Sequence, residues 1–205
     1  MRLFAIQRIL GLLLIVFSSS LLPPMLVSLW YGDGAHLAFV TAFFITLGIG
    51  FVSWLPVRRH KRDMRMRDGF IVVVLFWFVL SAIGALPFML SIKPQLSLTD
   101  SLFEAISGLT TTGATVITAI DELPRSILYY RQQLQWLGGM GIVVLAVAVL
   151  PLLGVGGMQL YRAETPGPVK DSKLTPRIAE TAKALWYIYL GLTIACTLAY
   201  WIAGM

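Results

Sequence analysis

The sequence has few charged residues and almost none of the side chains that bind metals or act as nucleophiles. Only 13% of its 205 residues are Asp, Glu, Lys or Arg, against roughly 25% in a soluble domain. The single cysteine, Cys196, excludes a disulfide framework within the chain. The two histidines, His36 and His60, lie far apart and fit no zinc-ligand spacing. No phosphate-binding loop or nucleophile–base pair is apparent, so the sequence does not indicate an enzyme.

Long apolar stretches take the place of the missing charge, since 58% of the residues are hydrophobic. A helix needs about 20 apolar residues to cross a bilayer. The stretches that meet this length are 9–32, 34–57, 69–90, 132–161 and 184–205. The first could be a signal peptide, but it is longer than a usual one and lacks an A-x-A cleavage site, which favours a retained helix. Pro23 and Pro24 are expected to kink or divide that helix.

The basic residues predict how the chain is oriented in the membrane. Most of the 16 Lys and Arg residues precede residue 9 or fall in 58–67 and 162–183, which share one side if the five spans alternate. Because short cytoplasmic loops are rich in Lys and Arg, we expect a cytoplasmic N-terminus and residues 92–131 outside. The net charge of +6 then favours contact with acidic lipid headgroups over contact with nucleic acid.

A short amphipathic segment, 98–119, lies between the third and fourth apolar stretches. Ser101 and Glu104 match a capping box, with Thr99 or Asp100 as alternative caps. A helix from Ser101 to Thr110 is about 15 Å long, half of the hydrocarbon thickness. A sixth full span would reverse the charge pattern, so we expect this segment to enter from outside and return. The predicted fold is therefore an all-α membrane protein with five transmembrane helices, one re-entrant pore helix and a filter loop.

The end of this segment is the main candidate for a functional site. Non-helical backbone at membrane depth is tolerated where it lines an aqueous path or is buried in protein, and carbonyl groups there replace the hydration shell of a cation. Gly113 permits backbone angles closed to other residues. We therefore predict a carbonyl-lined cation path where the chain leaves the helix, at Thr110–Gly113.

Other interpretations of these residues stay open. Thr and Gly are common at helix contacts in membranes, and the segment could be a structural hairpin or an interfacial helix. Asp121 and Glu122 either form an outer mouth that concentrates cations or belong to a solvated loop. The glycines of Gly138-Gly139-Met140-Gly141 favour close helix packing over a bend that widens a pore.

Several motifs together resemble a known family. These are residues 103–113 (FEAISGLTTTG), 135–142 (QWLGGMGI), 159–168 (QLYRAETPGP), 173–178 (KLTPRI) and 181–186 (TAKALW). In this order they resemble the membrane subunits of Trk potassium uptake systems, the TrkH type of the Trk/Ktr/HKT superfamily. The resemblance implies four potassium-channel-like helix–pore–helix units preceded by two extra helices. It also implies a filter lined by the carbonyl groups of Thr111, Thr112 and Gly113, with potassium at Thr111 and Thr112, in a bacterial inner membrane. It further implies no covalently bound cofactor, a homodimer and a cytoplasmic nucleotide-binding regulatory subunit.

The resemblance also divides the chain. The expected parts are two N-terminal transmembrane helices (1–57), a basic cytoplasmic loop (58–68), the first helix–pore–helix unit (69–154), a second cytoplasmic loop (155–183) and the first helix of a second unit (184–205). Only one pore segment is present, so the other three filter strands are expected from sequence outside an N-terminal fragment, or from other chains. The alternative is a non-conducting membrane scaffold or assembly subunit.

Overall fold

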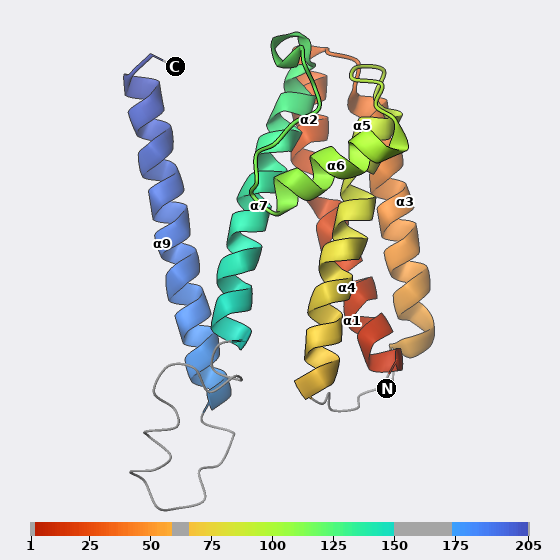
Figure 1. Ribbon diagram of the computed structural model, residues 1–205, viewed down its shortest axis with the longest axis vertical. Helices are drawn as coiled ribbons and strands as arrows, with labels where there is room; N and C mark the ends of the chain where they lie inside the picture. Colours follow the sequence, from red (N-terminus) through yellow and green to blue (C-terminus); the bar gives the residue numbers. More distant parts are fainter. Residues whose placement is uncertain (1–2, 59–65, 150–173, 205) are drawn as a thin grey trace, which may run out of the picture. The chain divides into compact units, whose positions relative to one another are not determined.

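The computed structural model describes residues 3–58, 66–149 and 174–204, and these residues form helices and loops without strands (Figure 1). The chain divides into two compact units, Met1–Gly138 and Gly139–Met205, which are described separately. In chain order the helices are α1 (Leu3–Ser19), α2 (Leu22–Tyr31), α3 (His36–Trp54), η1 (Leu55–Val57), α4 (Met66–Gly84), α5 (Leu86–Leu90), α6 (Leu98–Leu109), η2 (Ile120–Glu122), α7 (Arg125–Val149) and α9 (Leu174–Ile202).

Four helical segments are long and apolar enough to cross a membrane, in agreement with four of the expected spans. They are Leu3–Tyr31, His36–Val57, Ile71–Leu90 and Lys183–Ile202. The remaining expected span, 132–161, falls partly on α7 and partly outside the described residues. Most of the basic residues of the two predicted cytoplasmic loops also lie outside the described residues. The last span is the second part of a longer helix, because α9 already begins at Leu174. Residues 174–183 of the loop predicted at 155–183 are therefore helical.

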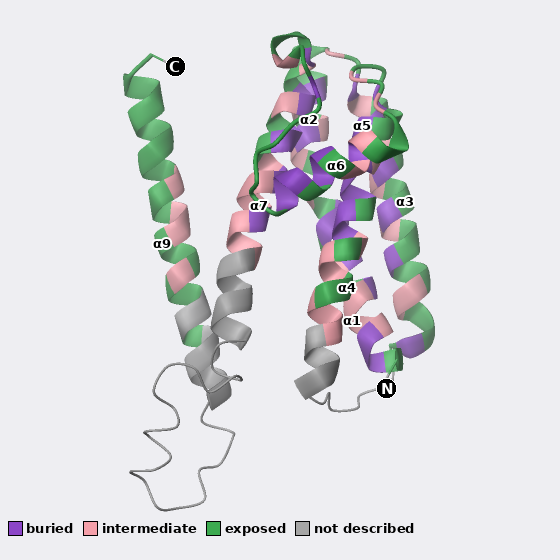
Figure 2. Ribbon diagram, in the orientation of Figure 1, coloured by how far each residue is buried: buried purple, intermediate pink, exposed green. Residues whose placement is uncertain are grey.

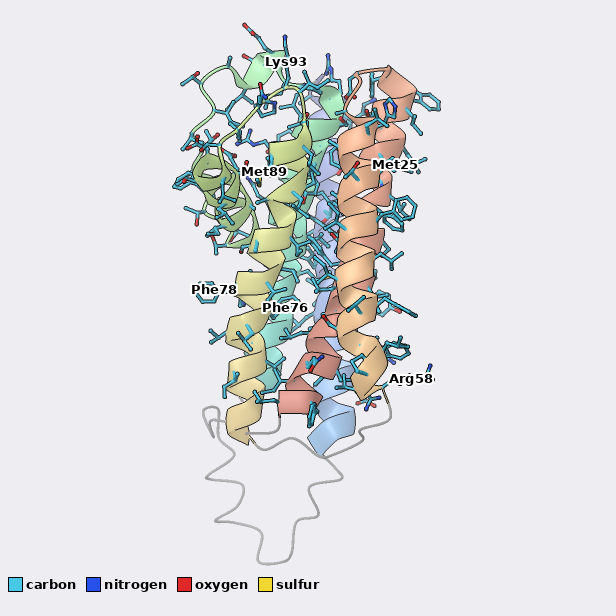
Figure 3. All side chains as sticks on the ribbon, turned by 90° about the vertical axis from the view of Figure 1, so that its right-hand side faces the viewer. Met25, Arg58, Phe76, Phe78, Met89 and Lys93 are labelled. Carbon is cyan, nitrogen blue, oxygen red and sulfur yellow. The ribbon has the colours of Figure 1, made fainter. Side chains whose placement is uncertain are left out.

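The first unit has an apolar outer surface. Figure 3 shows Arg58 and Lys93 at opposite ends of its long helices. Along α4, Phe78 points outward and is 72% exposed, whereas Phe76 packs against the core. Large exposed apolar side chains of this kind suit a surface in contact with lipid, since a soluble protein rarely exposes contiguous apolar patches.

Glycines allow α1 and α3 to pack closely. A Cβ atom on Gly11 would lie 2.9 Å from the carbonyl oxygen of Gly50, and one on Gly50 would lie 3.0 Å from the carbonyl oxygen of Gly11. Small residues at helix contacts let two backbones approach, which is a common means of association in membranes. The backbones of α1 and α3 are therefore in direct contact at Gly11 and Gly50.

The expected division of the first apolar stretch is confirmed, and its cause is the proline pair. The chain leaves α1 at Ser19 and re-enters helix at Leu22, one residue before Pro23. Pro24 has no N–H to donate to the carbonyl group of Ser20, four residues earlier. The side chain of Gln133 in α7 replaces that donor, with its Nε2 atom 2.7 Å from the Ser20 oxygen.

A second break, between α4 and α5, also involves α7. Pro87 occupies the second position of α5, and the helix is interrupted at Ala85. The hydroxyl group of Tyr130 donates to the carbonyl oxygen of Gly84 at 2.9 Å. The Tyr130 ring is fully buried, with ring centroids 5.4 Å from Phe39 and 5.3 Å from Phe88. Side chains of α7 therefore donate a hydrogen bond to a backbone carbonyl at each of the two helix breaks.

The first prediction concerns Gln133. Gln133→Leu is expected to lower the free energy of unfolding by about 1–3 kcal/mol, because the Ser20 carbonyl then loses its donor inside the protein. Gln132→Leu is the matched control, since Gln132 is the exposed neighbour and its loss breaks no contact of this kind. The measurement is thermal unfolding of the purified protein in detergent. Equal midpoints for the two variants would contradict the role given to Gln133.

Candidate functional site

The helix α6 begins earlier than the sequence suggested. Its N-cap is Ser97, whose Oγ accepts from the Asp100 N–H at 3.2 Å and donates to the Asp100 carboxylate at 2.7 Å. The predicted capping box of Ser101 and Glu104 is therefore wrong, and so are the alternative caps Thr99 and Asp100. Ser101 lies buried in the first turn, and its hydroxyl has no hydrogen-bond partner within the described part of the chain.

The helix lies across the long helices of the first unit, and the chain then turns back. Figure 1 shows the segment after α6 running along α7 toward the end at which α7 begins. Figure 2 shows buried residues gathered on α6 where it meets its neighbours, and exposed residues along the returning segment. The chain is non-helical from Thr111 to Ala119. It therefore leaves helix where the threonines were expected to end it.

The end of α6 has the hydrogen bonds of a Schellman motif. The N–H groups of Thr111 and Thr112 donate to the carbonyls of Gly108 (3.0 Å) and Ser107 (2.9 Å). Such an end places one residue in the left-handed region, most often glycine. Here that residue is Thr111, with φ of +57°, which costs a β-branched residue on the order of 1–3 kcal/mol. Gly113 also has positive φ, at +74°.

Three adjacent carbonyl groups at this turn lack hydrogen-bond donors among the residues that the structure describes. Thr111, Thr112 and Gly113 are exposed, and within the described residues their carbonyl oxygens accept no hydrogen bond. The next carbonyl, that of Ala114, accepts from the Ser107 hydroxyl at 2.6 Å. The structure thus brings the three predicted ligand residues together at the C-terminal end of α6, where the helix dipole is negative.

A buried carboxylate holds the returning segment. Glu104 Oε1 accepts from the Thr115 hydroxyl at 2.5 Å and from the Val116 N–H at 2.8 Å. Its Oε2 accepts from Arg131 Nε in α7 at 3.1 Å. Glu104 is 3% exposed and Arg131 9%. The loop is therefore fixed at two places, through Ser107 near its start and through Glu104 near Val116.

Sequence reasoning missed the role of this pair. It placed Glu104 in a helix cap and Arg131 among the charges outside the membrane. The available signal was an acid and a base within or beside apolar segments, since charges at such places pair and mark functional sites.

Asp121 and Glu122 lie away from these contacts. Both belong to η2 just before α7, and both are exposed. Within the described residues, Arg131 forms its salt bridge with Glu104 and not with either of these two acids. Their exposed positions fit both an outer mouth that concentrates cations and a solvated loop.

Asp33 connects the α2–α3 turn to the start of α7. Its carboxylate accepts from the Ser28 hydroxyl, from the Ala35 N–H at 3.1 Å and from the Ser126 N–H at 2.9 Å. Burial raises the pKa of Asp33, but these hydrogen bonds outweigh it and hold the pKa below its usual value. An ionised carboxylate at the start of a helix is also favoured by the helix dipole. The helices before residue 58 are therefore tied to the helix that follows the candidate loop.

Gly138 lets α7 pack directly on the end of α6. A Cβ atom there would overlap the carbonyl group of Leu109, whose carbon would be 2.7 Å away. The packing interpretation is therefore confirmed for Gly138. In the second unit, the Trp186 indole N–H contacts the Met140 sulfur at 2.7 Å.

Comparisons with known proteins give a consistent result. The family model described as "TrkH: Cation transport protein" matches residues 35–205. The Trk system potassium uptake protein TrkH of Vibrio parahaemolyticus is 65% identical over 201 residues, which is 98% of this chain and 41% of the relative. TrkH of Escherichia coli K12 is 61% identical, with 98% of this chain and 42% of the relative covered.

Solved structures agree. The crystal structure of the potassium transporter TrkH from Vibrio parahaemolyticus matches with a TM-score of 0.86 and 57% identity, over 100% of this chain and 40% of that one. The chain thus spans about two fifths of the length of the relatives it matches. The family transports cations and is not a family of enzymes. By this match over most of its length, the chain belongs to the TrkH family of cation transport proteins.

Proposed function

We propose that this chain supplies the first of four filter loops in a protein that takes up potassium across the bacterial inner membrane. The observation that carries the proposal is the row of carbonyl groups of Thr111, Thr112 and Gly113 at the end of α6, which accept no hydrogen bond from the described part of the chain. Carbonyl oxygens replace water around a dehydrated cation, and the negative end of the helix dipole favours the positive charge there. The names of the relatives support potassium as that ion.

One loop leaves most of an ion's coordination shell unfilled. The remaining three loops are expected from the rest of a full-length transporter, since the relatives are more than twice as long as this chain. In this proposal α6 is a re-entrant pore helix, Asp121 and Glu122 stand at the outer mouth, and the N-terminus is cytoplasmic. A second copy and a cytoplasmic nucleotide-binding subunit are the proposed partners, with lipid around the apolar surface.

The test places a reactive group on the proposed ion path. We consider a full-length transporter in which this chain replaces the matching segment of the Vibrio parahaemolyticus relative, hereafter the chimera. Its cysteines, including the exposed Cys196, are replaced, and Thr112→Cys is introduced. A membrane-impermeant, positively charged thiol reagent added outside is expected to block potassium uptake by at least about tenfold, because it puts a fixed charge where the cation must lose its water.

Potassium is expected to protect the cysteine, whereas sodium at the same concentration protects it less. Mass spectrometry measures how much of the protein is modified, and potassium uptake by cells without other potassium transporters measures the effect. Complete modification with uptake unchanged would contradict the proposal and favour the non-conducting scaffold.

A further inference from the structure

We infer that Glu104 and Arg131 form a positioning pair that sets the selectivity of the filter, an inference that rests on the proposed function. Neither residue contacts the proposed ion path directly. Both carboxylate oxygens of Glu104 are used, one toward the returning segment and one toward Arg131. The pair therefore links the backbone just after the filter to α7.

The first step in the argument is where Glu104 holds the chain. Its bonds reach Thr115 and Val116, two and three residues after Gly113. Thr115 Oγ1 also accepts from the Ile117 N–H at 3.1 Å. Because Thr111–Gly113 are exposed and have no carbonyl partners within the described residues, their placement depends on the points at which the loop is tied. Before the carbonyls, the loop is tied by the N–H groups of Thr111 and Thr112 at the helix end. After them, it is tied at Ala114 by the Ser107 hydroxyl and at Val116 by Glu104.

The second step is why a charged side chain is used. Gln would offer one acceptor oxygen of similar reach, but a carboxylate makes shorter and stronger hydrogen bonds. A buried carboxylate is unfavourable without a partner, and Arg131 provides one from the first half of α7. The ion pair therefore fixes the rotamer of Glu104 and maintains the charge that holds the loop.

The third step is why position should affect selectivity. A filter of carbonyl groups distinguishes two ions of equal charge by the size of its cavity and by the number and field of its oxygens. Displacement of the oxygens therefore alters the preference between ions, even when folded protein remains. A role limited to folding would change the amount of transporter and leave its ion preference unchanged.

The experiment measures the ratio of potassium to sodium uptake for variants of the chimera, normalised to folded protein by size-exclusion chromatography. Glu104→Ala is expected to lower this ratio by roughly tenfold or more, the scale at which outer-shell partners of ion sites act. Thr115→Val removes the hydroxyl that donates to Glu104 and accepts from the Ile117 N–H. It keeps the bond from the Val116 N–H to Glu104, so this milder variant is expected to lower the ratio less. Asp100→Asn is the matched control, because Asp100 is an acid of the same helix whose carboxylate accepts from Ser97 at the helix start, and it should leave the ratio unchanged.

A double variant separates positioning from charge. Arg131→Met leaves the Glu104 carboxylate without its partner and is expected to lower the ratio. Adding Glu104→Gln removes the unpaired charge while keeping an acceptor for Thr115 and Val116, so the double variant should recover part of the lost selectivity. A purely structural role predicts recovery of protein amount without recovery of the ratio.

The outcomes distinguish this inference from the proposed function. Gly113→Ala is measured beside the other variants, because it alters the filter itself. Selectivity lowered by Gly113→Ala but unchanged in folded Glu104→Ala, Thr115→Val and Arg131→Met would overturn the positioning pair and leave the filter in place. Selectivity unchanged in all of them would overturn the filter as well.

Discussion

Gly113→Ala is expected to lower the discrimination of potassium over sodium in the chimera by about tenfold, the effect of roughly 1.4 kcal/mol. Gly113 has φ of +74°, and no atom lies within 4 Å of the place that a Cβ would occupy. Alanine would therefore meet no clash. It would nevertheless disfavour the left-handed backbone by roughly 1–2 kcal/mol, and the peptide groups on either side would turn toward a different arrangement.

The control for this prediction is another glycine with the same backbone. Gly34, in the α2–α3 turn, has φ of +80° and also no atom within 4 Å of an added Cβ. Gly34→Ala should thus reduce stability to a similar extent without altering the ion preference. The measurement is competitive uptake of potassium in the presence of sodium. If the two variants had equal ion preference, Gly113 would not belong to the filter.

Gly138→Ala is expected to have the largest effect on stability. The new methyl group would overlap the backbone carbonyl of Leu109, and a backbone group cannot move aside as the tip of a side chain can. Alanine is otherwise favoured over glycine in a helix by about 1 kcal/mol, so any net loss measures the clash. Overpacking of this kind costs roughly 1–3 kcal/mol or more, and α7 must move away from the end of α6.

Gly48→Ala provides the comparison. Gly48 lies in α3 with no atom within 4 Å of an added Cβ, so this substitution should raise the thermal midpoint slightly. Gly138→Ala should lower that midpoint and reduce the yield of monodisperse protein in detergent. Similar midpoints for the two variants would show that α7 does not depend on contact with Leu109.

Much of the helical architecture could be predicted from the sequence, because a stretch of about 20 apolar residues is enough to indicate a membrane-spanning helix. The apolar stretches indicated four spans that the structure contains, and Pro23 with Pro24 indicated the break after α1. The prediction that Gly138 serves packing also followed from residue size. These are properties that a short stretch of sequence carries by itself.

The sequence pattern predicted the wrong N-cap for α6, because two nearby segments match the same helix-start motif. Ser97 is followed by Asp100, and Ser101 by Glu104, so both pairs fit a helix start. The structure uses the first, because Glu104 is taken by Arg131, 27 residues further along the chain. Thr111 is a second residue whose conformation could not be predicted from the local sequence. Its left-handed conformation is unusual for threonine, and the hydrogen bonds of the helix end, not its residue type, require it.

The contacts of α7 have a consequence for biosynthesis. The Ser20 carbonyl accepts a hydrogen bond from Gln133, which lies 113 residues later in the chain. The Gly84 carbonyl accepts from Tyr130, 46 residues later, and the Glu104 carboxylate accepts from Arg131, 27 residues later. A ribosome makes the acceptors first, so the nascent helices enter the lipid with these polar groups still lacking their final donors. We therefore expect the first unit to complete its packing only after residues 130–133 have been made.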